Sequence, residues 1–217
     1  GVSTRMIGAI IMTHGDNNGL VLPPRIAPIQ AMVIPVAQHK EGVLEKAAEL
    51  RDRLAAAGVR GKLDDSENTA GWKYAEYEMK GVPVRLEIGP RDIESNQCVL
   101  VSRHDRKKDF VSLDGLEKSV ADKLEEVRLG IWNKAYENRE RRTHSCRTLD
   151  EIKTSLAENG DGFIKAMWCG EEECEDRVKE LTGVGSRCIP FDQEHISDTC
   201  VCCGKPAKHM VLWAKAY

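Results

Sequence analysis

The sequence predicts an α/β domain, consisting of a mixed sheet with flanking helices, followed by a small α+β domain. Three observations support this fold class. Short apolar strands alternate with helical segments from residue 28 to residue 112, a long segment after residue 114 repeats apolar residues at helical spacing, and the last third carries two pairs of cysteines. Strands that alternate with helices are typical of layered α/β folds.

The composition is that of an ordinary soluble protein. At 217 residues the chain is long enough for one large or two modest domains, and 31% of its residues are charged while 41% are hydrophobic. No apolar run approaches the roughly 20 residues that a membrane-spanning helix needs. The N-terminal segment has no basic region and no small-residue cleavage site of a signal peptide. We therefore expect a cytoplasmic protein with reduced thiols and no membrane partner.

The net charge limits how the chain can bind nucleic acid. The formal charge is −3 and the pI about 6.1, so such binding needs a local basic surface. An ordinary solvated face is the alternative for any charged run. The two candidate basic surfaces are Arg103, Arg106, Lys107 and Lys108, and further along Arg139, Arg141, Arg142 and Arg147.

Residues 1–27 lack the material for a core. We expect a strand in GAIIM, a turn in HGDNNG and a second short strand in LVLPP, where two prolines end any ladder. Two strands and a turn cannot bury a core by themselves. This segment is therefore expected to belong to a domain that lies mostly upstream.

From residue 28 the pattern becomes regular. In the strand expected at 83–89, Arg85 and Glu87 alternate with apolar residues and therefore share one face. Gly58 and Gly81 are expected to end helices. The elements predicted here are a strand at 29–37, a helix at 42–57, a short strand near 59–64, a helix near 70–80, the strand at 83–89, and a hairpin of 97–103 with 109–113.

A long helix is predicted to follow. Asp114 and Glu117 have the spacing of a capping box, and the charged remainder of the helix suits a connector between two domains. Its expected buried stripe consists of Leu116, Val120, Leu124, Val127 and Ile131.

The last third is predicted as a small α+β unit. Thr148 and Glu151 form a second capping box before a short helix. The other expected elements are a loop at 141–147, a strand at 162–168, a helix after Cys174, a strand at 187–191, an exposed loop at 192–199 and a last strand from residue 209. A unit with so few apolar residues needs an additional source of stability, such as a bound metal ion.

Four cysteines have the spacing of a structural zinc site. Cys169 and Cys174 form a Cys-x4-Cys pair, and Cys200 and Cys203 form a Cys-x2-Cys pair. Zinc accepts four thiolates in a tetrahedron, and each short turn presents two sulfurs on one side of the chain. Iron could occupy the same four sulfurs. Four buried reduced thiols are the alternative, since free cysteine is often buried.

Other residues compete for the metal or lie outside its spacing. Cys202 could replace Cys203, although Gly204 after Cys203 suits the turn better, and His195 or His209 could replace a thiolate. Plain reduced thiols are expected for the three remaining cysteines, Cys98, Cys146 and Cys188.

Motifs in each third of the chain resemble one family. GVSTR followed by HGDNNGLVLPP is similar to the third class II motif and the segment after it in prolyl-tRNA synthetases of the archaeal and eukaryote-like type. GWKYAEYEMKGVPVRLEIGPRD resembles part of the anticodon-binding domain of these enzymes. The cysteine pairs, with a chain that ends in tyrosine, resemble their C-terminal zinc-binding domain. The resemblance divides the chain into the end of a catalytic domain at 1–27, an anticodon-binding domain at 28–130 and a zinc-binding domain at 131–217.

The resemblance implies a part in tRNA aminoacylation. The family attaches L-proline to tRNA(Pro) with ATP and Mg²⁺, and a homodimer is expected. Arg5 and Ser3 match positions that contact ATP, and both are expected on one face of an extended chain. The first two class II motifs have no counterpart here, so we expect a C-terminal fragment that does not aminoacylate alone. The role of the terminal residue, Tyr217, stays open between docking and a frayed end.

The resemblance also places tRNA anticodon binding on the sheet of the second domain. An arginine can donate to O6 and N7 of guanine while a carboxylate accepts from N1 and N2, and proline anticodons carry two guanines. A surface salt-bridge cluster is the alternative. The expected binding residues are Glu87, Arg91 and Asp92, with Arg103 and Lys73 next. Three aromatic residues, Trp72, Tyr74 and Tyr77, are expected in the core rather than stacked on bases.

A function of another class fits the same residues. A free-standing RNA-binding or regulatory adaptor could use an anticodon-binding fold together with a zinc module. Such an adaptor has no use for part of an ATP pocket, so the GVSTR segment favours the synthetase.

Overall fold

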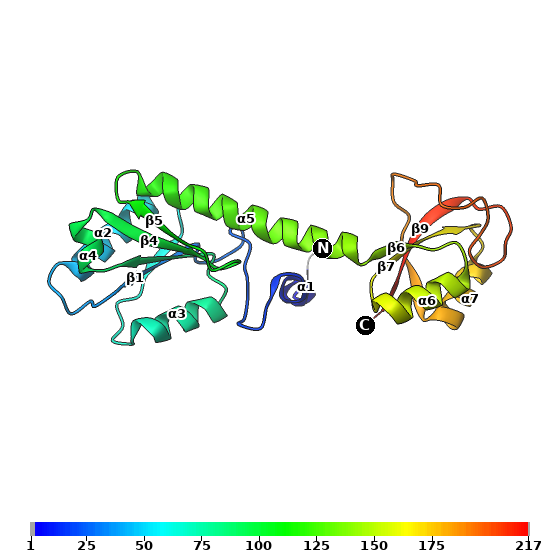
Figure 1. Cartoon of the computed structure of the whole chain (residues 1–217), viewed down its shortest axis with the longest axis horizontal. Coiled ribbons are helices and arrows are strands. Elements are labelled where there is room, and N and C mark those ends of the chain that lie inside the picture. Colours follow the sequence, from blue (N-terminus) through cyan, green and yellow to red (C-terminus); the bar gives the residue numbers. More distant parts are fainter. Residues whose placement is uncertain (1–2, 217) are drawn as a thin grey trace. The chain divides into compact units, whose positions relative to one another are not determined.

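The computed structural model describes residues 3–216, which form two compact units that meet after Ala135 (Figure 1). The boundary lies inside the long helix α5 (Leu116–Arg141). The predicted domain limits at residues 27 and 130 stay predictions. Among the described residues, no helix combines the length and the apolar character that a membrane crossing requires.

The first unit contains the predicted mixed sheet. Its strands lie in the order β2-β1-β3-β4-β5, with β1 parallel to β2 and β3, and with β4 antiparallel to β3 and β5. The strands are β1 (Ala31–Pro35), β2 (Gly61–Leu63), β3 (Val84–Ile88), β4 (Gln97–Ser102) and β5 (Lys108–Ser112). All five lie where the apolar patterns predict them, so the fold class is confirmed for this unit.

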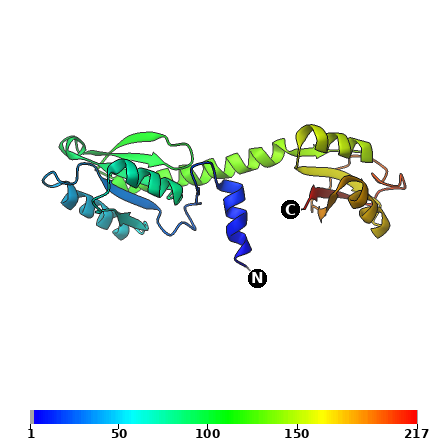
Figure 2. The ribbon, with the colours of Figure 1, turned by 90° about the horizontal axis from the view of Figure 1, so that it is seen from below.

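Helices cover the two faces of this sheet unequally. Helices α2 (Val43–Ala56) and α5 pack on one face, and α3 (Ala70–Met79) lies on the other (Figures 1 and 2). The short helix α4 (Pro90–Glu94) follows β3. The α2 and α5 face holds the main core, in which the predicted stripe of α5 is buried from Leu116 to Ile131.

Side-chain alternation divides the strands between the two faces. Leu86 pairs with Val33 and Leu100 on the α2 and α5 face. Glu87 pairs with Ile34 and Val99 on the opposite face, which α3 covers only in part. The prediction that Arg85 and Glu87 share a face is confirmed, because Arg85 Nη2 lies 2.9 Å from Glu87 Oε1.

The N-terminal segment differs from the prediction. Residues 5–14, which include GAIIM, form the helix α1 (Arg5–His14), and no strand forms over LVLPP. A run of five apolar residues suits a strand or a helix equally, so the sequence could not decide. The chain after α1 is tied to the end of α3, since Leu20 N–H donates to Met79 O over 2.9 Å. A Cβ on Gly19 would lie 2.4 Å from the same oxygen, so only glycine fits this crossing.

The predicted cap of α5 is wrong. The helix begins at Leu116 rather than at Asp114. The carboxylate of Asp114 accepts a hydrogen bond from Asn96, and that of Glu117 accepts from Arg53 over 2.8 Å. Partners from distant parts of the chain replace the local capping bonds.

The second unit is the predicted small α+β fold. Its sheet has the order β6-β7-β9-β8, with β6 parallel to β7 and the other pairs antiparallel. Helices α6 and α7 pack with the sheet around a core that includes the fully buried Trp213. The elements are β6 (Thr143–Ser145), α6 (Leu149–Asn159), β7 (Phe163–Trp168), α7 (Glu172–Thr182), β8 (Val184–Cys188) and β9 (His209–Lys215).

Two elements of this unit were predicted wrongly. Residues 143–145 form β6 rather than a loop, and the strand expected at 187–191 lies at 184–188 instead. The cap of α6 is confirmed, because Thr148 Oγ1 accepts from Glu151 N over 3.2 Å. The return bond goes to Arg147 N rather than to the cap residue. The last strand ends at Lys215, and Tyr217 lies outside the described residues.

Candidate functional site

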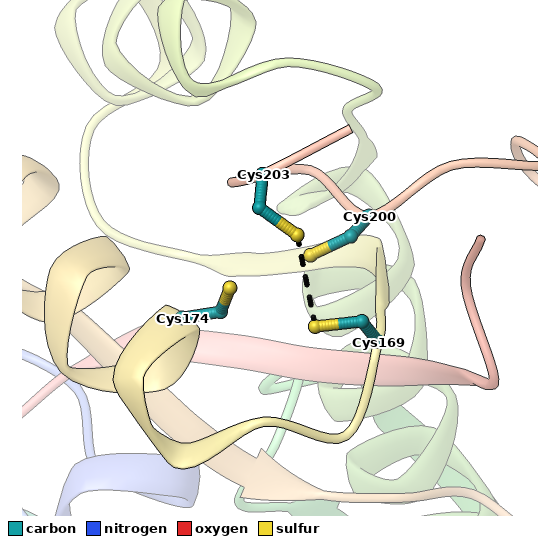
Figure 3. A group of neighbouring side chains, drawn as sticks. All are labelled: Cys169, Cys174, Cys200 and Cys203. Carbon is teal, nitrogen blue, oxygen red and sulfur yellow. Dashed lines mark hydrogen bonds between the residues drawn. The ribbon is translucent and has the colours of Figure 1, made fainter. Parts of the chain in front are cut away.

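The four predicted cysteines meet in the second unit. Their sulfurs all lie within 4.8 Å of one another (Figure 3). The Sγ atoms of Cys203 and Cys169 are 3.8 Å apart. A tetrahedron with metal–sulfur bonds of about 2.3 Å has sulfur–sulfur edges of about 3.8 Å. The four cysteines are therefore close enough to hold one metal ion.

Backbone geometry creates this cluster. Cys169 directly follows β7, and Cys174 lies in the first turn of α7. The turn of the second pair is closed by Gly204 N–H donating to Cys200 O over 3.1 Å. That turn is fixed to β7 by Val201 N–H, which donates to Met167 O over 2.8 Å. The two cysteine pairs are thus brought together by hydrogen bonds between segments that are distant in sequence.

The protonation of the sulfurs depends on their surroundings. Burial raises the pKa of the Cys174 thiol. The backbone N–H of Lys205 lowers the pKa of the exposed Cys203 thiol to about 7. Buried thiols stay protonated in the absence of a compensating charge, whereas a bound cation displaces their protons. The donor set therefore fits a thiophilic divalent metal.

None of the other residues considered for the metal belongs to the group of four. Cys202 packs against this cluster without being one of its four members, and neither histidine is a member. His195 Nε2 instead lies 3.1 Å from Asp198. Cys98 and Cys146 are buried free thiols, and Cys188 is an exposed one.

The first unit has a pocket, lined by both charged and apolar side chains, on the sheet face that α3 covers in part. Its volume is about 200 Å³. The residues that line it come from α3, β3 and the β4–β5 hairpin, and they are Tyr77, Glu78, Val82, Arg85, Val101, Ser102, Arg103, Arg106 and Lys108. The four cations of this lining are all paired with carboxylates: Arg85 and Lys108 with Glu87, Arg103 with Asp16, and Arg106 with Glu78. The pocket therefore offers both hydrogen-bond donors and acceptors to a polar ligand.

Arg85 lies in the middle of this polar face. Its guanidinium is 4.1 Å from the centre of the Tyr74 ring and pairs with Glu87. Lys108 Nζ lies 3.7 Å from the other carboxylate oxygen of Glu87. Burial, with the nearby charge of Glu87, raises the pKa of Tyr74 to about 12, so the phenol stays neutral. The guanidinium of Arg85 is thus held between an aromatic ring and a carboxylate.

Arg91 and Asp92 lie at the end of β3, on α4. Arg91 is exposed. Asp92 Oδ2 accepts the backbone N–H of Gly89 over 2.9 Å, which fixes the start of α4. Both residues follow closely in the chain after the strand that carries Arg85 and Glu87.

Two of the predicted tRNA-binding residues serve inside the fold instead. Lys73 is 1% exposed, and its ammonium donates to Gln38 Oε1 and Asp64 O, each over 2.9 Å. Arg103 is 5% exposed and forms a two-bond pair with Asp16 at 2.7 and 2.8 Å. This geometry does not support either residue as a direct contact to RNA.

Ser3 and Arg5 do not share the geometry assumed for them. Arg5 is the first residue of α1 rather than part of an extended chain, and Ser3 precedes the helix. Both are exposed. They are therefore accessible, but the argument that alternation places them on one face is wrong.

The structure also adds one residue that the sequence patterns did not single out and brings it together with two that they did. Glu78 lines the pocket beside Arg106 and Lys108 of the first candidate basic surface, and Arg106 Nε lies 2.6 Å from Glu78 Oε1. Tyr74 packs with the core of the α3 side and also supports Arg85. Spacing within one segment cannot reveal such groups, because they converge from three separate elements.

Comparisons with known proteins match both units. A family model described as the anticodon binding domain matches residues 30–123, and one described as prolyl-tRNA synthetase, C-terminal, matches residues 149–217. The whole chain is 58% identical over 217 residues to a proline–tRNA ligase of Clostridium novyi. The chain belongs to the prolyl-tRNA synthetase family. It contains the C-terminal, anticodon-binding region of such a synthetase.

Further relatives agree. The chain is 59% identical over 216 residues to a proline–tRNA ligase of Clostridium botulinum (strain Okra / Type B1) and 59% identical over 217 residues to one of Ruminiclostridium cellulolyticum. In each comparison all of this chain is matched, and it covers 45% of the relative's length. The chain thus spans a little under half of the prolyl-tRNA synthetases that it resembles.

Proposed function

We propose that the polar face of the first unit binds the anticodon of tRNA(Pro) and selects its guanines. The observation that carries this proposal is the arrangement of Arg85, Glu87 and Lys108 beside a pocket of about 200 Å³. A guanidinium can donate to O6 and N7 of guanine, and a carboxylate can accept from its N1 and N2 groups. The face offers both kinds of group at the scale of one unstacked base.

The assignment of residues follows from their place on this face and from the groups that hold their charges, since Glu87 is itself only 7% exposed. Glu87, Arg91 and Asp92 stay proposed anticodon contacts, and Arg85 and Lys108 join them. Lys73 and Arg103 act in this proposal only by positioning neighbours, because their cations are bonded inside the fold to Gln38, Asp64 and Asp16.

Replacing Arg85 with lysine tests the proposal. The Arg85→Lys variant keeps a positive charge beside Glu87 but loses the planar fork that pairs with a guanine edge. We expect tRNA(Pro) binding to weaken by about 1–3 kcal/mol, and discrimination against anticodons without guanine to decrease. A filter-binding assay with tRNA(Pro) transcripts measures both quantities.

The matched control is Arg128→Lys. Arg128 pairs with Glu125 on α5, and it lies away from the pocket residues. Equal affinity of the Arg85→Lys variant and the unchanged chain for tRNA(Pro), together with unchanged discrimination, would remove Arg85 from the binding site.

We further propose that Cys169, Cys174, Cys200 and Cys203 hold a structural Zn²⁺ ion. Four thiolates leave no open position for a water or a substrate, so the metal would stabilise the unit rather than take part in a reaction. Elemental analysis of protein prepared in zinc medium should find one zinc per chain. Stoichiometric iron would show that the site holds another metal, and absence of metal would show that the four cysteines are reduced thiols.

The remaining roles concern the complete synthetase. We propose that it acts in the cytoplasm as a homodimer and attaches L-proline to tRNA(Pro) with ATP and Mg²⁺. Ser3 and Arg5 are the proposed ATP contacts within this chain, and their exposure leaves them accessible. This chain alone is expected to show no measurable ATP affinity, and calorimetry with a micromolar signal would contradict that expectation.

A further inference from the structure

Phe110 is an exposed aromatic residue at the edge of the sheet. Its side chain is 69% exposed, although it lies in the middle of β5, between Lys108 and Ser112. Strand β5 is the last strand of the sheet, next to β4. Phe110 pairs with Val99, and Val99 pairs with Glu87, so the three side chains lie on one face. This is the face that carries Arg85 and the pocket.

The fold does not need the ring of Phe110 to hold β5 in place. The alternate residues of this strand lie on the α5 side, where Val111 packs against the main core and Asp109 accepts from Lys123 of α5. These contacts attach the strand from one side. On the other side, the cluster that α3 forms with the sheet involves β1 and residues near β3, and it does not include Phe110.

The surroundings of Phe110 suit a nucleic-acid base. Lys108, two residues away on the same face, is 56% exposed in its side chain. Aromatic rings beside a basic groove are a common platform for single-stranded RNA, because every base offers a flat face for stacking. The pair of Val99 and Phe110 lies two residue pairs along the ladder from Val101 and Lys108, which line the pocket, and is therefore the next pair on the same face.

We propose that Phe110 is a stacking platform for one unpaired base of the anticodon loop, adjacent to the base that enters the pocket. The inference rests on the proposed anticodon function and extends it with a contact that does not depend on base identity. Guanine selection belongs to the pocket, whereas Phe110 adds affinity for any base at its position.

The test measures binding of two RNA hairpins by fluorescence anisotropy. One hairpin carries a proline anticodon in its loop, and the other has adenines in place of the two guanines. The variants of this chain are Phe110→Ala, Phe110→Leu and Phe110→Trp. Phe191→Ala is the matched control, because Phe191 is also fully exposed but lies in the second unit.

If Phe110 stacks on a base, the variants should differ in their RNA affinity in a specific way. Phe110→Ala and Phe110→Leu should both weaken binding about 5- to 150-fold, by the same factor for both hairpins. Phe110→Trp should bind at least as tightly as the unchanged chain, and Phe191→Ala should have no effect. A 2-aminopurine at the stacked loop position should be quenched on binding, and this quenching should decrease in the leucine variant.

Other results overturn the inference. Retention of affinity in Phe110→Leu would mean that the ring only shields Val99. A loss confined to the guanine-containing hairpin would make Phe110 part of base selection. The two proposals fail separately, because equal binding of both hairpins by the unchanged chain contradicts guanine selection, while an effect of Phe110→Leu on both still supports stacking.

Discussion

Replacing Asp16 with asparagine is expected to destabilise the first unit by about 2–3 kcal/mol. The side chain of Arg103 is 3% exposed and that of Asp16 is 26% exposed. Breaking a fully buried pair costs about 3–5 kcal/mol, and an exposed pair contributes less than about 1 kcal/mol. Asp16→Asn leaves the buried guanidinium with a neutral acceptor, so the loss should lie between these limits.

The reverse change should cost less. Arg103→Met keeps most of the packing of the arginine stem and leaves Asp16, which water can reach, without its partner. We expect a loss of about 1–2 kcal/mol, because a partly hydrated carboxylate is penalised less than a buried guanidinium. Urea unfolding of both variants and of the double variant gives the coupling energy. The control is Asp122→Asn, from a pair with Lys118 in which both side chains are mostly exposed.

The same pair makes stability depend on pH. The hydrogen bond from Arg103 lowers the pKa of Asp16 from its ordinary value of 3.8. A carboxyl group whose pKa is lower in the folded state stabilises the fold above its unfolded pKa, and this contribution decreases as the pH falls. The difference in unfolding free energy between the unchanged chain and Asp16→Asn should therefore shrink as the pH decreases below about 4.

These variants also separate structure from RNA binding. At temperatures where all of them are folded, Asp122→Asn should bind tRNA(Pro) as well as the unchanged chain does, and Arg103→Met should lose only a small factor, because Arg103 positions its neighbours in the pocket lining. A tenfold loss of tRNA affinity in folded Arg103→Met would contradict the assignment of Arg103 as a residue that does not contact the RNA.

Two further changes test the packing of each unit. Cys200→Ser should abolish stoichiometric metal binding, measured by metal analysis, and lower the unfolding temperature of the second unit, measured by calorimetry. Cys188→Ser, at an exposed thiol, should leave both the metal content and the unfolding temperature unchanged. Gly130→Ala should destabilise the first unit by about 1–3 kcal/mol, because its Cβ would lie 2.3 Å from His104 Nε2. Gly8→Ala, also within a helix, has no atom within 4 Å of its Cβ and should not lower the urea midpoint, because alanine is more favourable than glycine in a helix interior.

The sheet of the first unit could be predicted because each strand carries its own pattern. Alternation in β3 fixes which side chains share a face of the sheet, and glycines mark helix ends. The helix α1 could not be predicted, because its apolar run has no period that separates strand from helix and none of its residues is buried. The strand β6 was missed for a different reason, since its three residues form a strand only through pairing with β7.

The candidate sites divide in the same way. The cysteine cluster was predictable, because the spacing of each pair already constrains where two sulfurs lie. The roles of Lys73 and Arg103 were not, because their partners Gln38, Asp64 and Asp16 lie 9 to 87 residues away. A basic side chain beside a binding motif has the same appearance in sequence whether it is solvated or buried.

The alternation of side chains along β3 produces both the hydrophobic core on one face of the sheet and the proposed binding face on the other. Leu86 is fully buried against α2 and α5, while its neighbours Arg85 and Glu87 form the polar face. A slip of one residue in the pairing with β4 would exchange the two sets, placing two charges in the core and leucine on the proposed RNA-binding face. The hydrophobic contacts that fix the register therefore also determine which side chains lie on that proposed face. For this reason, changes at Leu86 or Leu100 should weaken RNA binding only together with stability, whereas changes at Arg85 can separate the two.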